Sequence, residues 1–176
     1  MRSRSSPRKI EDEDELYNAA LRALMRRAHS IHEMKEYLGR RAEREESVAA
    51  VIARLRERAY LDDARFARDF ARRHAETRHQ GRFRVARELR ARGVPDSHIE
   101  AAIDLVFAEA DEAKSVRERI RRKMAHSPGP LDDRKIASLY RSLIAAGFSA
   151  DVIRAEIRAA TRADAPEFPA ADATET

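Results

Sequence analysis

The chain has 176 residues, a mass of 20.1 kDa and a formal net charge of +5 at pH 7, with 43% hydrophobic and 38% charged residues. No apolar run reaches the roughly 18 residues of a membrane span, and acids follow the basic N-terminus, which excludes membrane spans and secretory signals. The absence of cysteine excludes disulfides, thiol catalysis and cysteine-bound zinc. Only 6% of residues are aromatic and five are glycine, which disfavours barrels and sandwiches of short strands. We therefore expect a soluble, cytoplasmic, all-helical protein.

The first third of the chain is predicted to hold a tail and one module of three helices. Residues 1–13 begin with Arg, Ser and Pro without periodicity and are expected to form a disordered tail. The acids at residues 11–15 favour a helix start, because carboxylates stabilise the positive end of the helix dipole. Apolar residues at helical spacing then define module 1 over 14–60, with helices at 14–27, 31–42 and 46–58.

The same pattern predicts two further modules and an acidic tail. Module 2 spans 61–109, with helices at 63–77, 82–92 and 96–109, and module 3 spans 110–162, with helices at 111–125, 132–146 and 150–161. Residues 163–176 contain acids, Ala and Pro but no basic residue, and are predicted to be disordered. Residue types that start and stop helices support these bounds: N-caps at Ser30, Asp62, Asp96 and Asp132, and C-terminal glycines at Gly93 and Gly147.

An internal repeat relates the three modules. An offset of 51 residues places Met34, Leu38, Val48 and Ile52 on apolar residues of module 2. A further offset of 54 places those on apolar residues of module 3 and matches Gly93 with Gly147. Since a unit of about 50 residues buries little surface alone, the modules should stack. The predicted fold class is all-α, with three tandem three-helix modules forming an elongated, curved helical-repeat body.

The residues that could carry catalysis are better explained as structural. Paired acids at residues 62–63 and 132–133 each precede an apolar helix, where an N-cap and a first-turn acid account for them. The six histidines are scattered and form no HExxH-like arrangement, and nucleophile, P-loop and dinucleotide motifs are absent. We therefore expect a protein that is not an enzyme and that has no catalytic, cofactor or metal site.

Basic side chains instead point to binding. Of 36 basic residues 31 are Arg, which forms bidentate contacts with phosphate and carboxylate groups. At helical spacing they form three rows: Arg65, Arg68 and Arg72; Arg84, Arg87 and Arg90; and Lys114, Arg117 and Arg121. Such rows suit a phosphate backbone or an acidic protein surface, although a merely solvated face is the alternative. Phe66, Phe70 and Phe83 are interpreted as core residues, so base stacking is not expected.

Several motifs occur in a family-specific order. They are LDD at 61–63, FA at 66–67, Arg73, Gly81 and ELRARGV at 88–94, preceded by LMRRAHSIHEMKEYL at 24–38 and followed by AAGFSADVI at 145–153. In this order and spacing the chain resembles the RecX family, regulators of the RecA recombinase, over about residues 16–160. Departures are small: Ala59 stands where the family often has Gly, and Arg82 follows Gly81 where Pro is common.

The resemblance implies a non-catalytic modulator of RecA. Members of the family bind RecA filaments on single-stranded DNA, lie along the helical groove, and limit ATP hydrolysis, strand exchange and the stimulation of repressor self-cleavage in DNA repair and the SOS response. The expected partners are therefore RecA and its filament, with direct DNA contact as a further expectation, and the expected state is a cytoplasmic monomer. We assign the contacts to the three basic rows as a hypothesis, because the resemblance does not single them out.

Two alternatives to this function stay open. A general DNA- or RNA-binding helical protein, acting independently of RecA, would bind bare nucleic acid with a steep salt dependence. A helical scaffold for an unrelated protein would have no effect on a recombinase.

Overall fold

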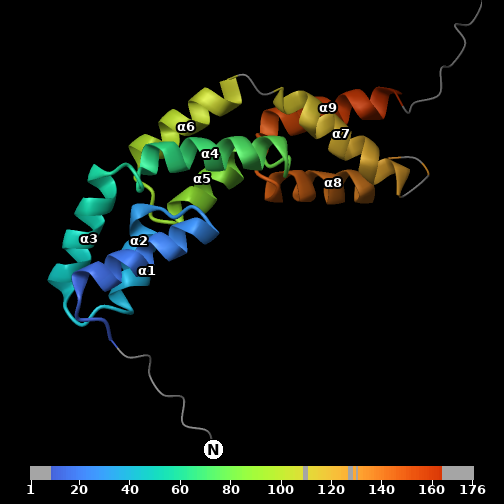
Figure 1. Ribbon diagram of the computed structural model, residues 1–176. Coiled ribbons are helices and arrows are strands. Elements are labelled where there is room, and N and C mark those ends of the chain that lie inside the picture. Colours follow the sequence, from blue (N-terminus) through green and yellow to red (C-terminus); the bar gives the residue numbers. More distant parts are fainter. Residues whose placement is uncertain (1–8, 109–110, 127–128, 130, 164–176) are drawn as a thin grey trace, which may run out of the picture. The chain divides into compact units, whose positions relative to one another are not determined.

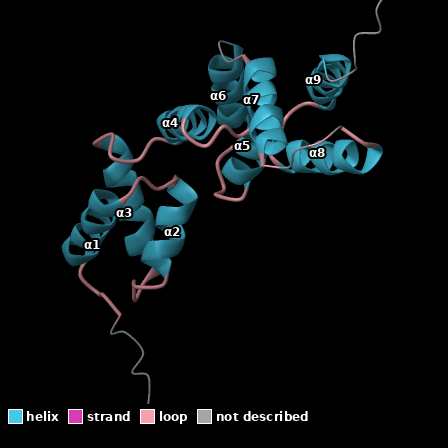
Figure 2. Ribbon diagram, turned by 90° about the vertical axis from the view of Figure 1, so that its right-hand side faces the viewer, coloured by secondary structure: helices cyan, strands magenta, loops and turns pink. Residues whose placement is uncertain are grey.

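A computed structural model describes residues 9–108, 111–126, 129 and 131–163. Within these ranges the regular elements are nine α-helices and no strand (Figure 2). The all-α class is confirmed, and each predicted helix lies within three residues of an observed one. The helices are α1 Glu13–Arg26, α2 Ile31–Gly39, α3 Glu45–Glu57, α4 Asp63–Glu76, α5 Arg82–Arg90, α6 Asp96–Ala108, α7 Glu112–Ala125, α8 Asp133–Ala145 and α9 Ala150–Ala163 (Figure 1).

The chain divides into two compact units, Met1–Ala110 and Asp111–Thr176. In the first unit, α1, α2 and α3 contact one another and enclose a cluster of buried side chains that includes Leu16, Met34, Leu38, Val51 and Leu55. These residues recur three or four positions apart on each helix, so each helix turns one apolar face inward.

The backbone of Ile10, before α1, pairs with the segment that follows α2. The backbone N–H of Ile10 donates to the carbonyl of Arg41 at 2.7 Å, and the N–H of Glu43 donates to the carbonyl of Ile10 at 2.9 Å. The apolar side chain of Ile10 also packs against the first cluster. The backbone pairing holds it in this position. Ile10, within the predicted tail of residues 1–13, thus pairs with the backbone that follows α2. The rest of that predicted tail, residues 1–8, and most of the acidic tail, residues 164–176, lie outside the described residues.

Helices α4, α5 and α6 enclose a separate cluster in the same unit. Its members include Phe66, Ala67, Val85, Leu89 and Ile99, and the packing of α4 against α6 is the most extensive contact. Ala67 and Ala71 on α4 are fully buried, and their small side chains allow this close approach. The trio therefore has a core of its own.

One predicted helix cap in this trio is wrong. Asp96 is the first residue of α6 rather than its N-cap, because the carbonyl of the preceding Pro95 accepts the N–H groups of His98 and Ile99. The Asp96 carboxylate instead accepts a 2.7 Å hydrogen bond from Arg90 Nε. Proline is well suited to this place, since its missing N–H is not needed at a helix start.

The second unit contains α7, α8 and α9 around a third cluster, which includes Val116, Ile120, Leu139, Leu143 and Ile153. Gly147 follows α8 with φ +87°, as expected of a residue that ends a helix in the left-handed region. The N–H of Phe148 donates back to the carbonyl of Leu143, which completes the turn.

Burial supports the sequence offsets of 51 and 54 residues. The matched positions are buried in all three trios: Met34, Leu38, Val48 and Ile52; Val85, Leu89, Ile99 and Ile103; and Leu139, Leu143, Ile153 and Ile157. The same offsets also match Ile31 with Arg82 and Ile136. Arg82 is polar where the other two are apolar, and all three positions are half-buried. The repeat thus corresponds to equivalent core positions.

Candidate partner-binding surface

Helix α4 presents the first predicted basic row to solvent. Arg65, Arg68 and Arg72 are exposed, while Phe66, Ala67 and Ala71 on the other face are buried. Arg65 Nη2 donates to the carbonyl of Ala59 at 2.6 Å. Among the described residues, neither Arg68 nor Arg72 has an ion-pair partner in its neighbourhood. These two guanidinium groups are therefore available to an external anion.

The second predicted row, on α5, is partly neutralised. Arg84 forms an ion pair with Glu88 at 2.8 Å, and Arg90 forms one with Asp96 at 2.7 Å. Arg87 is exposed and, in the part of the chain that the structure describes, unpaired. Because two of its three cations already have carboxylate partners, this row is a weaker anion site than the row on α4.

The loop before α2 joins the first two trios through Ser30. Its hydroxyl oxygen accepts the N–H of Glu33 at 3.0 Å, and the Glu33 carboxylate accepts the N–H of Ser30 at 3.2 Å, a reciprocal capping box. The same hydroxyl donates to the carbonyl of Arg92 at 2.6 Å. On the other side, the Asp63 carboxylate accepts the N–H of Ile31 at 2.9 Å. The start of α2 is thus fixed to the start of α4 and to the loop between α5 and α6.

Glu33 is the charged centre of this joint. Its carboxylate receives Arg27 Nη1 at 3.0 Å and Arg92 Nη1 at 2.6 Å. Burial alone would raise the pKa of Glu33, but hydrogen bonds from Arg27 and the Ser30 N–H, with the charges of both arginines, outweigh it and lower the pKa. Burial and the charge of Arg27 lower the pKa of the neighbouring His29. Near neutral pH Glu33 is therefore ionised and His29 is neutral.

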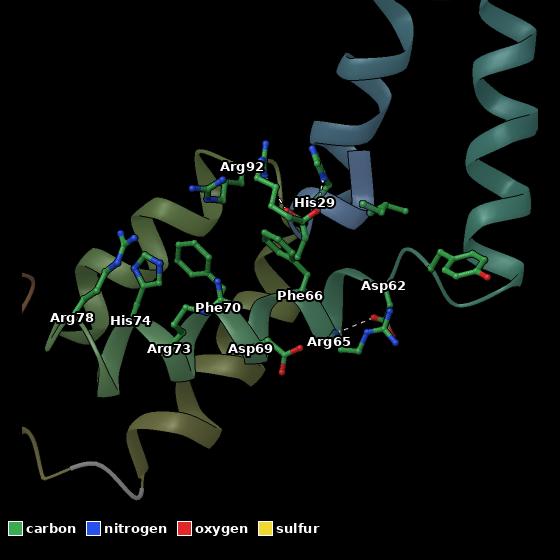
Figure 3. Close-up of a pocket in the computed structure, with 14 residues that line it drawn as sticks. His29, Asp62, Arg65, Phe66, Asp69, Phe70, Arg73, His74, Arg78 and Arg92 are labelled. Carbon is green, nitrogen blue, oxygen red and sulfur yellow. Dashed lines mark hydrogen bonds between the residues drawn. The ribbon is translucent and has the colours of Figure 1, made fainter. Parts of the chain in front are cut away.

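A cavity of about 510 Å³ lies between this joint and α4 (Figure 3). Its lining contains five arginines and two aspartates, and His29 closes one side. Arg92 and His29 face Phe66 and Phe70 of α4 (Figure 3), and the cavity is open to solvent and carries a net positive charge. The charged lining residues are Arg27, Arg65, Arg73, Arg78, Arg92, Asp62 and Asp69.

An aromatic row forms the inner wall of the cavity. Phe66, Phe70 and His74 follow one another along α4, with ring centroids 6.0 Å and 3.8 Å apart. The Arg92 guanidinium lies 5.1 Å from the centre of the Phe70 ring, in cation–π contact. In the described part of the chain, Arg92 Nε is buried without a hydrogen-bond partner, which is costly unless a ligand or water supplies an acceptor.

The core interpretation of the phenylalanines is correct for Phe66, holds in part for Phe70, and is wrong for Phe83. Phe66 is buried, whereas Phe70 is half-buried at the cavity wall and Phe83 is 60% exposed. Helical spacing places Phe70 on the apolar face of α4, but the face is only partly covered, because the loop of residues 27–29 stands away from it. Aromatic surface therefore accompanies the arginines.

Sequence reasoning missed most of the cavity. Of its arginines it named only Arg65 as a contact, whereas Arg73 entered only as a matching motif residue. Arg27, Arg78 and Arg92 lie in other segments and share no periodicity with α4. No signal in the local sequence could have brought these segments together.

Neither the paired acids nor the histidines assemble a metal site. Asp62 accepts the N–H of Arg65 and Asp132 accepts the N–H of Lys135, which confirms both as N-caps. His74 Nδ1 lies 2.6 Å from the side-chain oxygen of Gln80. Among the residues that the structure describes, no group of three His, Cys, Asp or Glu side chains could hold a metal ion.

Comparison with known proteins identifies the family. Residues 17–55 match the model of the first three-helix domain of RecX, and residues 62–103 match that of the second. The chain is 39% identical over 150 residues to the "Regulatory protein RecX" of Halorhodospira halophila, an alignment that covers 84% of this chain and 89% of that protein. The chain belongs to the RecX family.

Other relatives and solved structures agree. The RecX protein of Stenotrophomonas maltophilia strain R551-3 is 37% identical over 142 residues, covering 79% of this chain and 83% of that protein. The crystal structure of RecX from Lactobacillus salivarius superposes with a TM-score of 0.74 at 21% identity, covering 84% of this chain and 95% of that one. A second RecX structure gives a TM-score of 0.70. The fold of this chain is the RecX fold.

The cavity of this RecX chain lies where its two matched domains meet. Arg27 and His29 belong to the segment matching the first domain, and the lining residues of α4 belong to the segment matching the second. The rows on α4 and α5 also fall within the second domain. In this RecX protein, no described helix has the length and apolar character needed to cross a membrane.

The third predicted row lies in the other unit of this RecX protein. Lys114, Arg117 and Arg121 line a groove between α7 and α9. Arg117 Nε forms an ion pair with Glu156 at 3.2 Å, whereas the exposed Lys114 and Arg121 have no such partner among the described residues. The row therefore borders a hollow surface rather than a flat one.

Proposed function

We propose that this protein is a non-catalytic regulator that binds the RecA recombinase and its filament on single-stranded DNA in the cytoplasm. It lowers RecA's ATP hydrolysis, strand exchange and stimulation of repressor self-cleavage, and so acts in DNA repair, recombination and the SOS response. The observation that carries this proposal is the similarity to proteins named "Regulatory protein RecX" over four-fifths of the chain.

The contact surface in this proposal is the exposed side of α4 with the adjoining cavity. Arg68 and Arg72 are exposed and unpaired among the described residues, so binding them to an anion would not require breaking an existing ion pair. The buried Nε of Arg92 adds a donor that lacks an acceptor. Acidic side chains of the filament and phosphates of its DNA both match this chemistry.

The first experiment measures RecA's DNA-dependent ATP hydrolysis while this protein is added at substoichiometric ratios. Excess single-stranded DNA is added in parallel. We expect suppression well below one copy per RecA, and we expect it to persist with excess DNA. An effect that more DNA abolishes would indicate a general nucleic-acid-binding protein, and no effect at all would indicate a scaffold for another partner.

The contact surface is tested with Arg68→Gln/Arg72→Gln. The matched control is Arg22→Gln/Arg26→Gln, which removes two exposed arginines at the same spacing from α1. We expect the α4 variant to need about three- to thirtyfold more protein for half-suppression, since two charge-assisted contacts are lost. Equal potency of both variants would remove α4 from the contact surface.

A further inference from the structure

The groove between α7 and α9 has the features of a protein-docking site. It has a volume of about 640 Å³ and is lined by residues of these two helices alone, so it belongs entirely to the second unit. Its lining extends along α7 from Lys114 to Met124. At 1.5 Å per residue this is about 15 Å, or roughly three helical turns.

The floor of the groove is apolar. Ile120 is buried, Met124 and Ala160 are half-buried, and Ala159 is exposed. On α9 the floor is formed by alanines, whose short side chains leave the groove open. A methionine beside them adapts its shape to different apolar partners. Covering this floor would remove apolar surface from water, which favours a ligand with apolar side chains.

The α7 side of the groove carries a row of cations. Lys114, Arg117 and Arg121 follow α7 at helical spacing and form a basic edge. Arg117 is held by Glu156, whereas the ammonium of Lys114 and the guanidinium of Arg121 have no ion pair among the described residues. Two cations of α7 therefore border the apolar floor, and neither is paired with a carboxylate among the described residues.

These features favour a protein segment over a nucleic acid as the ligand of the groove. A phosphate backbone offers no apolar side chain for the floor, and Glu118 and Glu156 in the lining would repel a continuous polyanion. An amphipathic helix offers both parts, with apolar residues at i, i+3, i+4 and i+7 and acids along one side. Its length of about three turns matches the groove.

We propose that the α7–α9 groove is the docking site for an acidic amphipathic helix of a partner protein, with apolar side chains against Met124 and Ala159 and carboxylates on Lys114 and Arg121. This inference goes beyond the proposed function, since it concerns the second unit and needs neither RecA nor DNA. The two can fail separately, because the experiment below contains no recombinase.

The test measures binding of a fluorescein-labelled acidic peptide of about 14 residues by fluorescence anisotropy, with the full-length protein. The peptide carries leucines at i, i+3, i+4 and i+7 with glutamates beside them, and a scrambled peptide of the same composition is the control. We expect the amphipathic peptide to bind at least about tenfold more tightly than the scrambled one. No binding at about 1 mM protein, or equal binding of both peptides, would overturn the proposal.

Variants separate the floor from the rim. Ala159→Lys keeps a helix-forming residue and adds a positive charge to the floor of the groove. If the acidic peptide bound through charge alone, this variant would bind it more tightly. Because its side chain crosses the floor, we expect it instead to weaken the peptide about tenfold or more. Lys114→Gln/Arg121→Gln should weaken the peptide about three- to tenfold. The control Arg134→Gln/Arg141→Gln removes two exposed arginines of α8 and should leave binding unchanged.

Two other occupants would appear as distinct results. A labelled oligo(dT) of about 20 nucleotides that loses affinity with the rim variant but not with Ala159→Lys, while the peptide does not bind, would assign the groove to nucleic acid. Concentration-dependent self-association in sedimentation that Ala159→Lys abolishes would assign it to a second copy. Either result would contradict the proposal, and circular dichroism checks that each variant is folded.

Discussion

The side-chain hydroxyl of Ser30 donates a 2.6 Å hydrogen bond to the backbone carbonyl of Arg92, across 62 residues of sequence. Ser30 is fully buried and is also the N-cap of α2. One small side chain therefore starts a helix in the first trio and holds the loop after α5 in the second. The cavity beside α4 depends on this joint, because Arg92 forms part of its wall.

Replacing Ser30 should destabilise the first unit. Ser30→Ala removes the helix cap and leaves the Arg92 carbonyl without its donor, so we expect a loss of about 1–3 kcal/mol of unfolding free energy. The control is Ser47→Ala, at a half-buried position inside α3. Urea denaturation followed by circular dichroism measures both. If both variants lost less than about 0.5 kcal/mol, the joint would contribute little to stability.

Gly93 should not tolerate a side chain. Its φ is +69°, and a Cβ there would lie 2.4 Å from Cγ of His32 in the first trio. We therefore expect Gly93→Ala to cost more than about 1 kcal/mol, from backbone strain and from displacement of His32. Gly39→Ala is the matched control, since nothing lies within 4 Å of its Cβ position and alanine favours a helix. Thermal unfolding that ranked Gly39→Ala below Gly93→Ala would contradict this explanation.

The two paired-acid motifs should respond differently to the same substitution. Asp63 is buried and accepts the N–H of Ile31, whereas its counterpart Asp133 is exposed in the first turn of α8. We expect Asp63→Ala to lower the unfolding free energy by about 1–3 kcal/mol, and Asp133→Ala by at most about 1 kcal/mol through the helix dipole. Equal losses in urea denaturation would show that Asp63 acts only as a first-turn acid.

Acidification should loosen the joint in two stages. Burial and the charge of Arg27 lower the folded-state pKa of His29 below the 6.5 of an unfolded histidine. The contribution of neutral His29 to the unfolding free energy is therefore complete above pH 6.5 and is lost as the pH falls through the folded-state pKa. The pKa of Glu33 is lowered from 4.5, so its contribution is present above that value and disappears at more acidic pH.

Unfolding free energy measured from pH 7.5 to 3.5 tests both stages. We expect His29→Gln to flatten the pH dependence below about 6.5 and Glu33→Gln to flatten it below about 4.5. His126→Gln, at an exposed position after α7, is the control for His29→Gln. A curve for His29→Gln that runs parallel to that of the parent protein would exclude His29 as the source of the first stage.

The helices and their core faces could be predicted from the sequence because the signals are local. Spacing of three and four residues identifies buried positions such as Leu89 and Leu143, and cap residues such as Ser30 and Asp62 mark helix starts. The family could also be identified, from motifs in order along the chain. The proposed roles of the basic rows and the module boundaries stay predictions.

The use of each charged residue was decided by tertiary structure. Arg68 and Arg84 look equivalent in the sequence, but Arg84 is paired with Glu88 while Arg68 is exposed and unpaired among the described residues. The cavity unites residues 27–29, the face of α4 and Arg92, which helical periodicity cannot connect. Periodicity specifies which side of each helix is buried, because that depends on neighbours within a few residues. Which cations pair and which surround a cavity depends on contacts such as that between Ser30 and Arg92, which form only when distant segments pack together.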